Sequence, residues 1–238
     1  MKLELLNISG DTHLMSASEN FVNHYESASS CAINIMEQIN NRIGLYGILQ
    51  QSINKKLSSV IDLGANVGMF SIFISPLAEK VFSVEPTPGH ISLMRELIEM
   101  LGIKNIKPCE YAISTQDGIS EFQIHTRNST MNSFLNHKTD IFYGAPIKVE
   151  TKTLSSLIDT FGLDKVDFVK MDIEGFENHI ILDPSFDDAS NKVGVFYIEV
   201  HDFENKGLLQ DNYRKIENKF VSLGRKVTRI AADGMLVK

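Results

Sequence analysis

The stretch from residue 59 to residue 74 constrains what this chain can fold into more than any other. It opens with a short apolar run, Val60–Leu63, which is typical of a buried β-strand. The run breaks at Gly-Ala-Asn-Val-Gly (64–68) and resumes as an apolar segment, 69–74, that predicts a helix packed on the sheet. Glycine lets the backbone bend sharply and carries no Cβ atom that would block a ligand. A strand, a tight glycine turn and a helix form a nucleotide-binding corner, because the helix N-terminus directs free N–H groups at the ligand.

The spacing of the glycines separates two classes of ligand. A dinucleotide fingerprint, G-x-G-x-x-G, needs its second glycine where the pyrophosphate approaches. Here that position is Asn66, and the pattern is D-x-G-x-x-x-G, with Asp62 in the strand end and Gly64 and Gly68 as the glycines. An acid beside the turn disfavours a pyrophosphate and suits a cationic or zwitterionic ligand. The stretch resembles the first motif of Rossmann-like methyltransferases that use S-adenosylmethionine (SAM); the alternative is an ordinary βα turn of another α/β protein.

A second carboxylate stands at the distance that a ribose site needs. Residues 80–86 form the next predicted strand, which ends in Glu85 and Pro86, and Glu85 lies 21 residues after Gly64. An acid about twenty residues after the glycine turn sits at the end of the neighbouring strand and can accept hydrogen bonds from ribose hydroxyls. SAM carries an adenosine ribose, so the same geometry serves it. The alternative is a strand-end acid in solvent.

Two later strands also end in polar groups. Residues 166–172 read as a buried strand followed by Glu174 and Glu177, and residues 194–201 read as the fifth core strand. Adjacent parallel strands would bring the candidate catalytic groups to one edge of the cleft, and these groups are Asp172, Glu174, Glu199 and His201. The alternative for Glu174 and Glu177 is that they only cap the N-terminus of the next helix, where acids are favoured, and for Glu177 this is the role that we expect.

These strand-end groups fit two chemical roles. His201 or Asp172 could act as the general base that removes a proton from an acceptor hydroxyl. Alternatively, Asp172, Glu199 and His201 could hold a divalent cation, for which oxygen-rich ligands favour Mg²⁺ or Mn²⁺. In a methyltransferase, which the first motif resembles, the base or the cation would lie beside the methyl group that is transferred.

The order of the remaining segments predicts one α/β domain over residues 1–238. Strands alternate with helices, which indicates a Rossmann-like doubly wound sheet, mostly parallel, with an antiparallel C-terminal strand from a hairpin at 225–237. Residues 1–52 have helical spacing in part and are expected to form an N-terminal helical extension or cap. The irregular segment 126–146 mixes polar and aromatic residues, which suits a lid that reads the acceptor rather than SAM.

Composition narrows the class of partner and the location. The net charge is −7, which offers no reason to expect DNA, RNA or an anionic membrane as partner. There is no run of 18 apolar residues and no signal-peptide pattern, so we expect no membrane span and a cytoplasmic protein. Two cysteines, Cys31 and Cys109, form neither a disulfide framework nor a zinc pattern.

Four segments together resemble the FkbM family of SAM-dependent methyltransferases: 60–68, 84–86, 169–177 and 198–201. The run Lys-x-Asp-x-Glu-Gly-x-Glu, from Lys170 to Glu177, is the most specific of them. The resemblance implies SAM as cofactor and methyl transfer to an oxygen, often a hydroxyl of a sugar, glycan or polyketide-like metabolite. Residues 106–113 are expected to form the third strand, and the resemblance implies that the end of this strand lies against the adenine. The expected SAM-binding residues are Asp62, Gly64, Ala65, Asn66, Gly68, Glu85, Tyr111, Ala112 and Asp172.

Two other functions compete with this interpretation. An NAD(P)-dependent oxidoreductase would share the fold, but Asn66 in place of the second glycine argues against it. A binding or regulatory protein could keep the SAM fold without catalysis, and the intact acids Asp172, Glu174 and Glu199 argue against that. The residues name neither the acceptor nor an oligomeric state.

Overall fold

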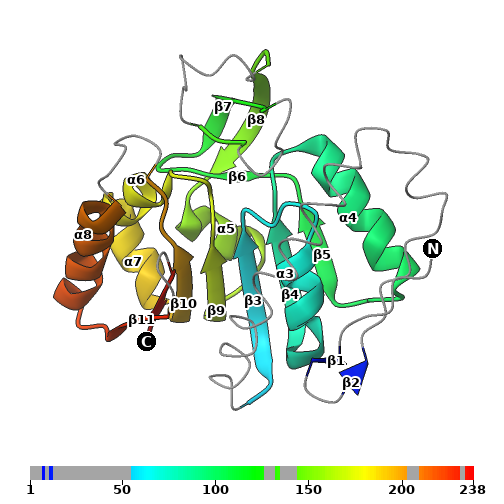
Figure 1. Cartoon of the computed structure of the whole chain (residues 1–238), viewed down its shortest axis with the longest axis horizontal. Coiled ribbons are helices and arrows are strands. Elements are labelled where there is room, and N and C mark those ends of the chain that lie inside the picture. Colours follow the sequence, from blue (N-terminus) through cyan, green and yellow to red (C-terminus); the bar gives the residue numbers. More distant parts are fainter. Residues whose placement is uncertain are drawn as a thin grey trace.

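The computed structural model describes most of the chain after residue 54 (Figure 1). The described residues are 55–125, 132–134, 144–202, 209–230 and 234–238, together with the short antiparallel pair β1 (Asn7–Ile8) and β2 (Asp11–Thr12). The expected helical cap at 1–52 lies outside the described residues apart from these two strands, and so does Cys31. Most of the expected lid at 126–146 lies outside them as well.

A central sheet of seven strands organises the described part of the chain, in the order β11-β12-β10-β9-β3-β4-β5. The five parallel strands are β3 (Leu57–Leu63), β4 (Ala78–Val84), β5 (Ile106–Cys109), β9 (Val166–Met171) and β10 (Val193–Glu199). The hairpin of β11 (Val227–Arg229) and β12 (Gly234–Val237) adds β12 antiparallel to β10. The predicted doubly wound, mostly parallel sheet with an antiparallel C-terminal strand is therefore confirmed. The strand order reverses between β3 and β9, which is where such sheets bind ligands.

Helices cover both faces of this sheet (Figure 1). One face packs against α3 (Met69–Ile74) and α4 (Pro88–Met100), with the short 3-10 helix η1 (Ser75–Leu77) following α3. The other face packs against α5 (Leu154–Thr160), α6 (Glu177–Leu182), α7 (Ser185–Asn191) and α8 (Leu209–Ser222). Alternate strand residues supply the two cores: Val60 packs toward α3 and α4, and Ile61 toward α5 to α8. Among the described residues, no helix is both long and apolar enough to cross a membrane.

A smaller sheet lies beyond the carboxyl ends of the parallel strands, at the top of Figure 1. It consists of β6 (Ala112–Ile113), β8 (Ile147–Lys152) and β7 (Gly118–Phe122), with β8 in the middle. The sequence predicted one continuous third strand over 106–113, and this prediction is wrong. The strand ends at Cys109, because the N–H of Tyr111 bonds back to the Cys109 carbonyl at 3.0 Å and turns the chain. Ala112 and Ile113 then pair with Thr151 and Lys152 of the smaller sheet.

Arg225 fastens the C-terminal hairpin to the rest of the fold, and this gives a test of stability. Its guanidinium donates to the carbonyls of Ser190 (3.1 Å), Val193 (3.0 Å) and Gly194 (2.7 Å). We expect Arg225→Ala to lower the free energy of unfolding by about 2–3 kcal/mol, because hydrogen bonds to a charged group are strong. Chemical denaturation measures this difference.

Arg214 provides the matched control, since its side chain is 73% exposed and has one contact of 3.5 Å, with Asp211. Arg214→Ala should change the free energy of unfolding by no more than about 0.5 kcal/mol. Equal, small effects of both substitutions would contradict the anchoring role of Arg225.

Candidate functional site

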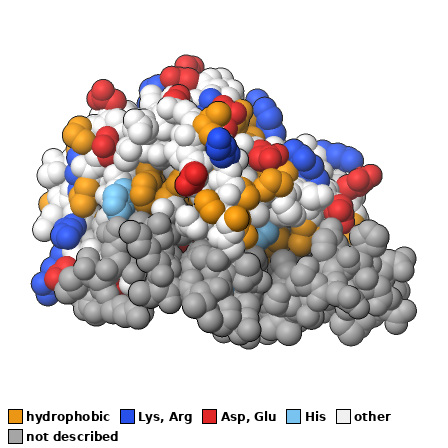
Figure 2. All heavy atoms as spheres, turned by 90° about the horizontal axis from the view of Figure 1, so that it is seen from above, with side chains coloured by type: hydrophobic (Ala, Val, Ile, Leu, Met, Phe, Trp, Pro, Cys, Tyr) orange, Lys and Arg blue, Asp and Glu red, His pale blue; other side chains and the backbone are white. Residues whose placement is uncertain are grey.

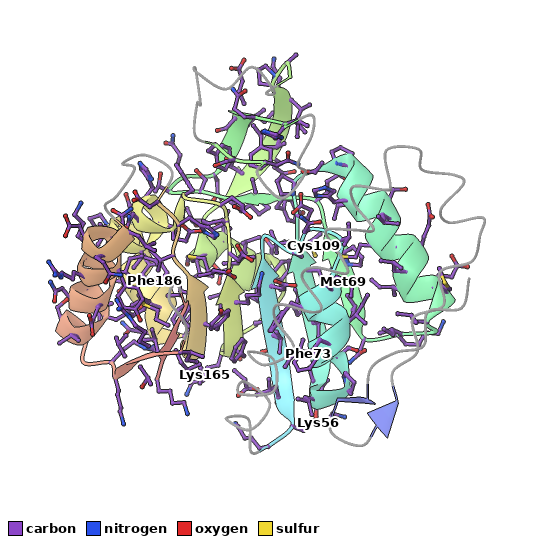
Figure 3. The ribbon with its side chains drawn as sticks, viewed as in Figure 1. Lys56, Met69, Phe73, Cys109, Lys165 and Phe186 are labelled. Carbon is purple, nitrogen blue, oxygen red and sulfur yellow. The ribbon has the colours of Figure 1, made fainter. Side chains whose placement is uncertain are left out.

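A cavity of about 760 Å³, including space open to solvent, lies at the carboxyl ends of β3, β4 and β9. Figure 3 marks this end of the sheet by Met69 and Cys109, with Lys56 and Lys165 at the opposite end. The predicted site residues that line the cavity are Gly64, Ala65, Asn66, Glu85, Tyr111, Ala112, Asp172 and Glu174. The other predicted site residues, Asp62, Gly68, Glu199 and His201, do not line it. The structure therefore brings most of the predicted groups together at one cavity and leaves four outside its lining.

The glycine turn is required by contacts within the protein itself. A Cβ atom on Gly64 would lie 1.8 Å from the carbonyl oxygen of Asp172, and a Cβ on Gly68 would lie 2.6 Å from Cγ of Met94. Both glycines also have positive φ angles, +74° and +85°. From the sequence, we expected the absence of Cβ atoms at these two positions to leave room for a ligand. The structure corrects that reason, because the space is already filled by the neighbouring strand end and by α4.

Asn66 and Glu85 form the wall of the cavity beside this turn. Asn66 has a φ of +52°, which asparagine tolerates better than most residues, and its Oδ1 accepts from the N–H of Val67 at 2.7 Å. Glu85 Oε2 accepts from the N–H of Asn66 at 3.0 Å, and Oε1 accepts from the N–H of Thr87 at 2.9 Å. The Nδ1 of His90 lies 3.2 Å from the same Oε1, so it donates, because a carboxylate can only accept.

These hydrogen bonds determine the ionisation state of Glu85 and how many further hydrogen bonds its carboxylate can accept. Burial alone would raise the pKa of Glu85, but the hydrogen bonds from His90 and Thr87 outweigh it and hold the pKa below its ordinary value. Glu85 is therefore ionised at neutral pH. A carboxylate offers about four acceptor positions, and Thr87 and His90 contact Oε1 while Asn66 contacts Oε2. His90, which lines the cavity, was missed in the sequence; its position in the first turn of α4, close after the strand-end acid, was the available signal.

A buried ion pair lies beneath the cavity. The register of β3 and β9 places Asp62 beside Lys170, whose Nζ is 3.5 Å from Asp62 Oδ1 and 3.1 Å from Asp172 Oδ2. Ser71 Oγ donates to Asp62 Oδ2 at 2.7 Å. Burial raises the pKa of Asp62, while Lys170 and Ser71 act in the opposite direction. Asp62 thus supports the strand end from below, and Lys170, which sequence analysis did not assign to the site, reaches the cavity wall.

His201 stands behind two carboxylates of the cavity wall. Its Nε2 is 3.7 Å from Asp172 Oδ1 and 3.7 Å from Glu174 Oε2, and its Nδ1 is 3.0 Å from Glu177 Oε1. Burial alone would lower the pKa of His201, but Glu177, Glu174 and Asp172 outweigh it and raise the pKa well above 6.5. The imidazole is therefore protonated at neutral pH, and neither ring nitrogen can accept a proton.

Glu174 has an unusual backbone and an unusual pKa. Its φ is +53°, a left-handed conformation that is uncommon for residues other than glycine, asparagine and aspartate. Burial raises the pKa of Glu174 to about 8, and although His201 lowers it, Asp172, Glu177 and Glu199 add to the increase. One ligand atom each from Asp172, Glu174 and His201 lies within 4.8 Å of the others, so these three could hold a cation. Glu174 takes the place in this group that the sequence analysis gave to Glu199.

The described part of the expected lid crosses the cavity. Asn132 Nδ2 donates to Thr87 Oγ1 at 3.2 Å, beside Glu85, and Ser133 Oγ donates to the carbonyl of Glu174 at 3.0 Å. The ring of Phe134 lies 5.1 Å from Phe122 and 5.1 Å from Phe176, and all three rings line the cavity. Residues 132–134 therefore contact both ends of the cavity. The sequence analysis expected this segment to serve the acceptor alone.

A family model described as the methyltransferase FkbM domain matches residues 62–227, which is more than half of the chain. The chain belongs to this family. The match contains the glycine turn, Glu85, and the loop and strand end that carry Asp172, Glu174 and His201.

Two curated proteins and one solved structure are similar to this FkbM domain. The 2-O-methyltransferase NoeI of Sinorhizobium fredii is 26% identical over 61% of this chain and 64% of its own length. The methyltransferase sdnD of Sordaria araneosa is 26% identical over 51% of this chain and 58% of its own length. The chain thus spans about three fifths of these relatives. The crystal structure of a methyltransferase FkbM from Methylobacillus flagellatus has a TM-score of 0.52 at 14% identity, covering 77% of this chain and 44% of that one. This likeness supports the same Rossmann-like fold.

The close contact between Gly64 and the carbonyl of Asp172 predicts the effect of substituting Gly64. Gly64→Ala should lower the free energy of unfolding by about 2–4 kcal/mol, because the new Cβ meets the Asp172 backbone and the residue keeps a positive φ. Gly89→Ala is the control: a Cβ there has no heavy atom within 4 Å, and the residue lies in the first turn of α4. It should stabilise the protein by about 0.5–1 kcal/mol. Thermal unfolding of the two variants should show opposite shifts, and two equal shifts would refute the contact.

Proposed function

We propose that this FkbM domain is a SAM-dependent methyltransferase that methylates a hydroxyl oxygen of a small-molecule or glycan acceptor. The observation that supports this most directly is the arrangement along one cavity. Ionised Glu85 stands at one end, and Asp172 and Glu174 stand at the other. SAM has a ribose diol and a cationic sulfonium, and these two ends match its two polar features.

The ribose belongs, in this proposal, at Glu85. Glu85 Oε1 is contacted by Thr87 and His90, whereas Oε2 accepts from the N–H of Asn66, so in this proposal the ribose hydroxyl binds at Oε2. The adenine would then lie toward Tyr111 and Ala112, which line the same cavity. The methionine part would extend along the glycine turn toward Asp172. The carboxyl oxygens of Asp172 and Glu174 at that end suit both its ammonium and its sulfonium group.

SAM supplies an electrophilic methyl group, and its sulfonium becomes a neutral thioether after transfer. The protein then has two tasks, to align the acceptor oxygen with the methyl group and to accept the hydroxyl proton. We propose Glu174 for the second task, because its pKa of about 8 is close to an ordinary working pH. Asp172, whose Oδ2 lies 3.1 Å from Lys170 Nζ, is proposed to orient the acceptor hydroxyl.

This assignment differs from the expectation from the sequence, in which His201 or Asp172 was the general base. His201 is proposed here as a fixed positive charge beside the carboxylates, since its pKa is raised and it does not line the cavity. A divalent cation remains an alternative. Asp172, Glu174 and His201 would hold it, and it would supply a Lewis acid that lowers the pKa of the acceptor hydroxyl. Activity lost in EDTA and restored by Mn²⁺ would assign that role.

The acceptor is proposed to be a small hydroxylated molecule such as a sugar, glycan or secondary metabolite. The name of NoeI, a 2-O-methyltransferase, supports transfer to oxygen. Figure 2 looks down on the cavity end of the molecule, where lysines and arginines are interspersed with acids and apolar side chains. This surface and the net charge of −7 support an acceptor other than a nucleic acid. The cytoplasmic location expected from the sequence stays a prediction.

The assignment of the ribose site can be tested by binding alone. Glu85→Gln should weaken S-adenosylhomocysteine by about 10- to 100-fold, the effect of losing one charge-assisted hydrogen bond. Glu79→Gln, an exposed acid at the other end of β4, should leave the affinity unchanged. Isothermal titration calorimetry gives both constants. Binding of NAD⁺ in place of S-adenosylhomocysteine by the wild-type protein would favour the oxidoreductase alternative.

The proposed base predicts the pH dependence of the reaction. Glu174 is a carboxylic acid below its pKa of about 8 and a carboxylate above it, so kcat/KM should rise as the pH increases through 8. Glu174→Gln should remove this rise and lower kcat about 100-fold or more. Asp172→Asn should keep the rise at a reduced rate. A wild-type profile that is flat between pH 6 and 9 would exclude Glu174 as the base.

A further inference from the structure

Glu177 is a buried acid of the Lys170–Glu177 motif to which the proposed chemistry gives no role. It is the first residue of α6 and is 1% exposed. The sequence analysis expected it to cap that helix. Its contacts reach in another direction, toward the loop that precedes α6 and toward the end of β10.

One oxygen of Glu177 collects three groups. Its Oε1 accepts from the N–H of Ile173 at 3.0 Å and from the N–H of Gly175 at 3.3 Å. The Nδ1 of His201 lies 3.0 Å from the same oxygen. The first two donors are the residues on either side of Glu174, and the third lies two residues after the end of β10. A single carboxylate therefore ties the loop after β9 to the end of β10.

The bonds to Ile173 and Gly175 bear directly on the backbone of Glu174. Glu174 is held at a φ of +53°, a conformation that persists only where its surroundings impose it. Glu177 binds the N–H of the 172–173 peptide and the N–H of the 174–175 peptide, which lie on either side of residues 173 and 174. Ser133 Oγ donates to the Glu174 carbonyl at 3.0 Å. These contacts direct the Glu174 side chain into the cavity wall.

The bond to His201 bears on the orientation of the imidazole ring. A carboxylate only accepts hydrogen bonds, so Nδ1 of His201 carries a hydrogen and donates it to Glu177. Nε2 is thereby turned toward Asp172 Oδ1 and Glu174 Oε2, at 3.7 Å from each. A ring rotated away from Glu177 would remove its charge from both carboxylates.

We propose that Glu177 is a positioning residue for the transfer reaction, which holds Glu174 and His201 in their working arrangement without touching either substrate. The inference rests on the proposed function of the site. It predicts that loss of the Glu177 carboxylate impairs the chemical step while leaving SAM binding intact, because Glu177 does not line the cavity.

The informative variant is Glu177→Gln, which has the same shape and keeps an oxygen for the two backbone N–H groups. We expect kcat to fall about 10- to 100-fold, the effect of losing one charge-assisted hydrogen bond, with the KM for SAM within about twofold of wild type. Glu99→Gln, an exposed acid on α4, should leave kcat unchanged. A purely structural Glu177 would give a lower melting temperature and an unchanged kcat, and this result would overturn the proposal.

A double-mutant cycle tests whether Glu177 acts through His201. If it does, Glu177→Gln should have little further effect on kcat in a His201→Gln background. Additive effects of the two substitutions would contradict the coupling.

A third measurement needs neither turnover nor a variant. Nitrogen-15 NMR of the wild-type imidazoles should show the Nδ1 of His201 protonated and hydrogen-bonded, and an unprotonated Nδ1 would overturn the proposal even if Glu177→Gln fails to fold. A wild-type protein that transfers no methyl group to any tested acceptor would instead refute the proposed function, and the NMR result would still decide the orientation of His201.

Discussion

The close approach of Gly64 to the carbonyl of Asp172 is the contact on which the site depends. It joins the end of β3 to the end of β9, at the point where the strand order reverses. These two strand ends position residues on two sides of the cavity. The turn after β3 carries Asn66, and the loop after β9 carries Glu174. A side chain at position 64 would push the end of β3 away from the end of β9, whether or not a ligand is bound. The glycine turn is therefore first a requirement of the fold and only then part of a binding site.

Charge is the second constraint on this region. The buried Lys170 lies between Asp62 and Asp172. His201 lies among Asp172, Glu174 and Glu177. Two cationic groups thus lie among four carboxyl groups, and the pKa of Glu174 is raised to about 8, first by burial and then by the acids Asp172, Glu177 and Glu199. A cationic ligand would relieve this excess. The same reasoning makes SAM a better occupant of the cavity than a pyrophosphate, as the spacing of the glycines also indicated.

The sequence predicted those features that depend on short, regular patterns. The strand, turn and helix of 60–74, the strand-end position of Glu85 and the shared edge of β9 and β10 follow from hydrophobic periodicity and fixed spacing. Other features depend on contacts between distant residues. Asp62 of β3 is paired with Lys170 of the neighbouring strand β9, and no local pattern in the sequence shows that pairing. The break after Cys109 and the three bonds to Glu177 are likewise tertiary, so neither could be predicted from the residues alone.

The central claim is that one cavity holds the ribose at Glu85 and the reacting sulfur beside Asp172 and Glu174. A crystal structure of the protein with S-adenosylhomocysteine tests it most directly. The account predicts a ribose hydroxyl within hydrogen-bonding distance of Glu85 Oε2 and the thioether sulfur at the end of the cavity formed by Asp172 and Glu174. A nucleoside bound outside this cavity, or one reversed so that its adenine lies against Asp172, would contradict the account.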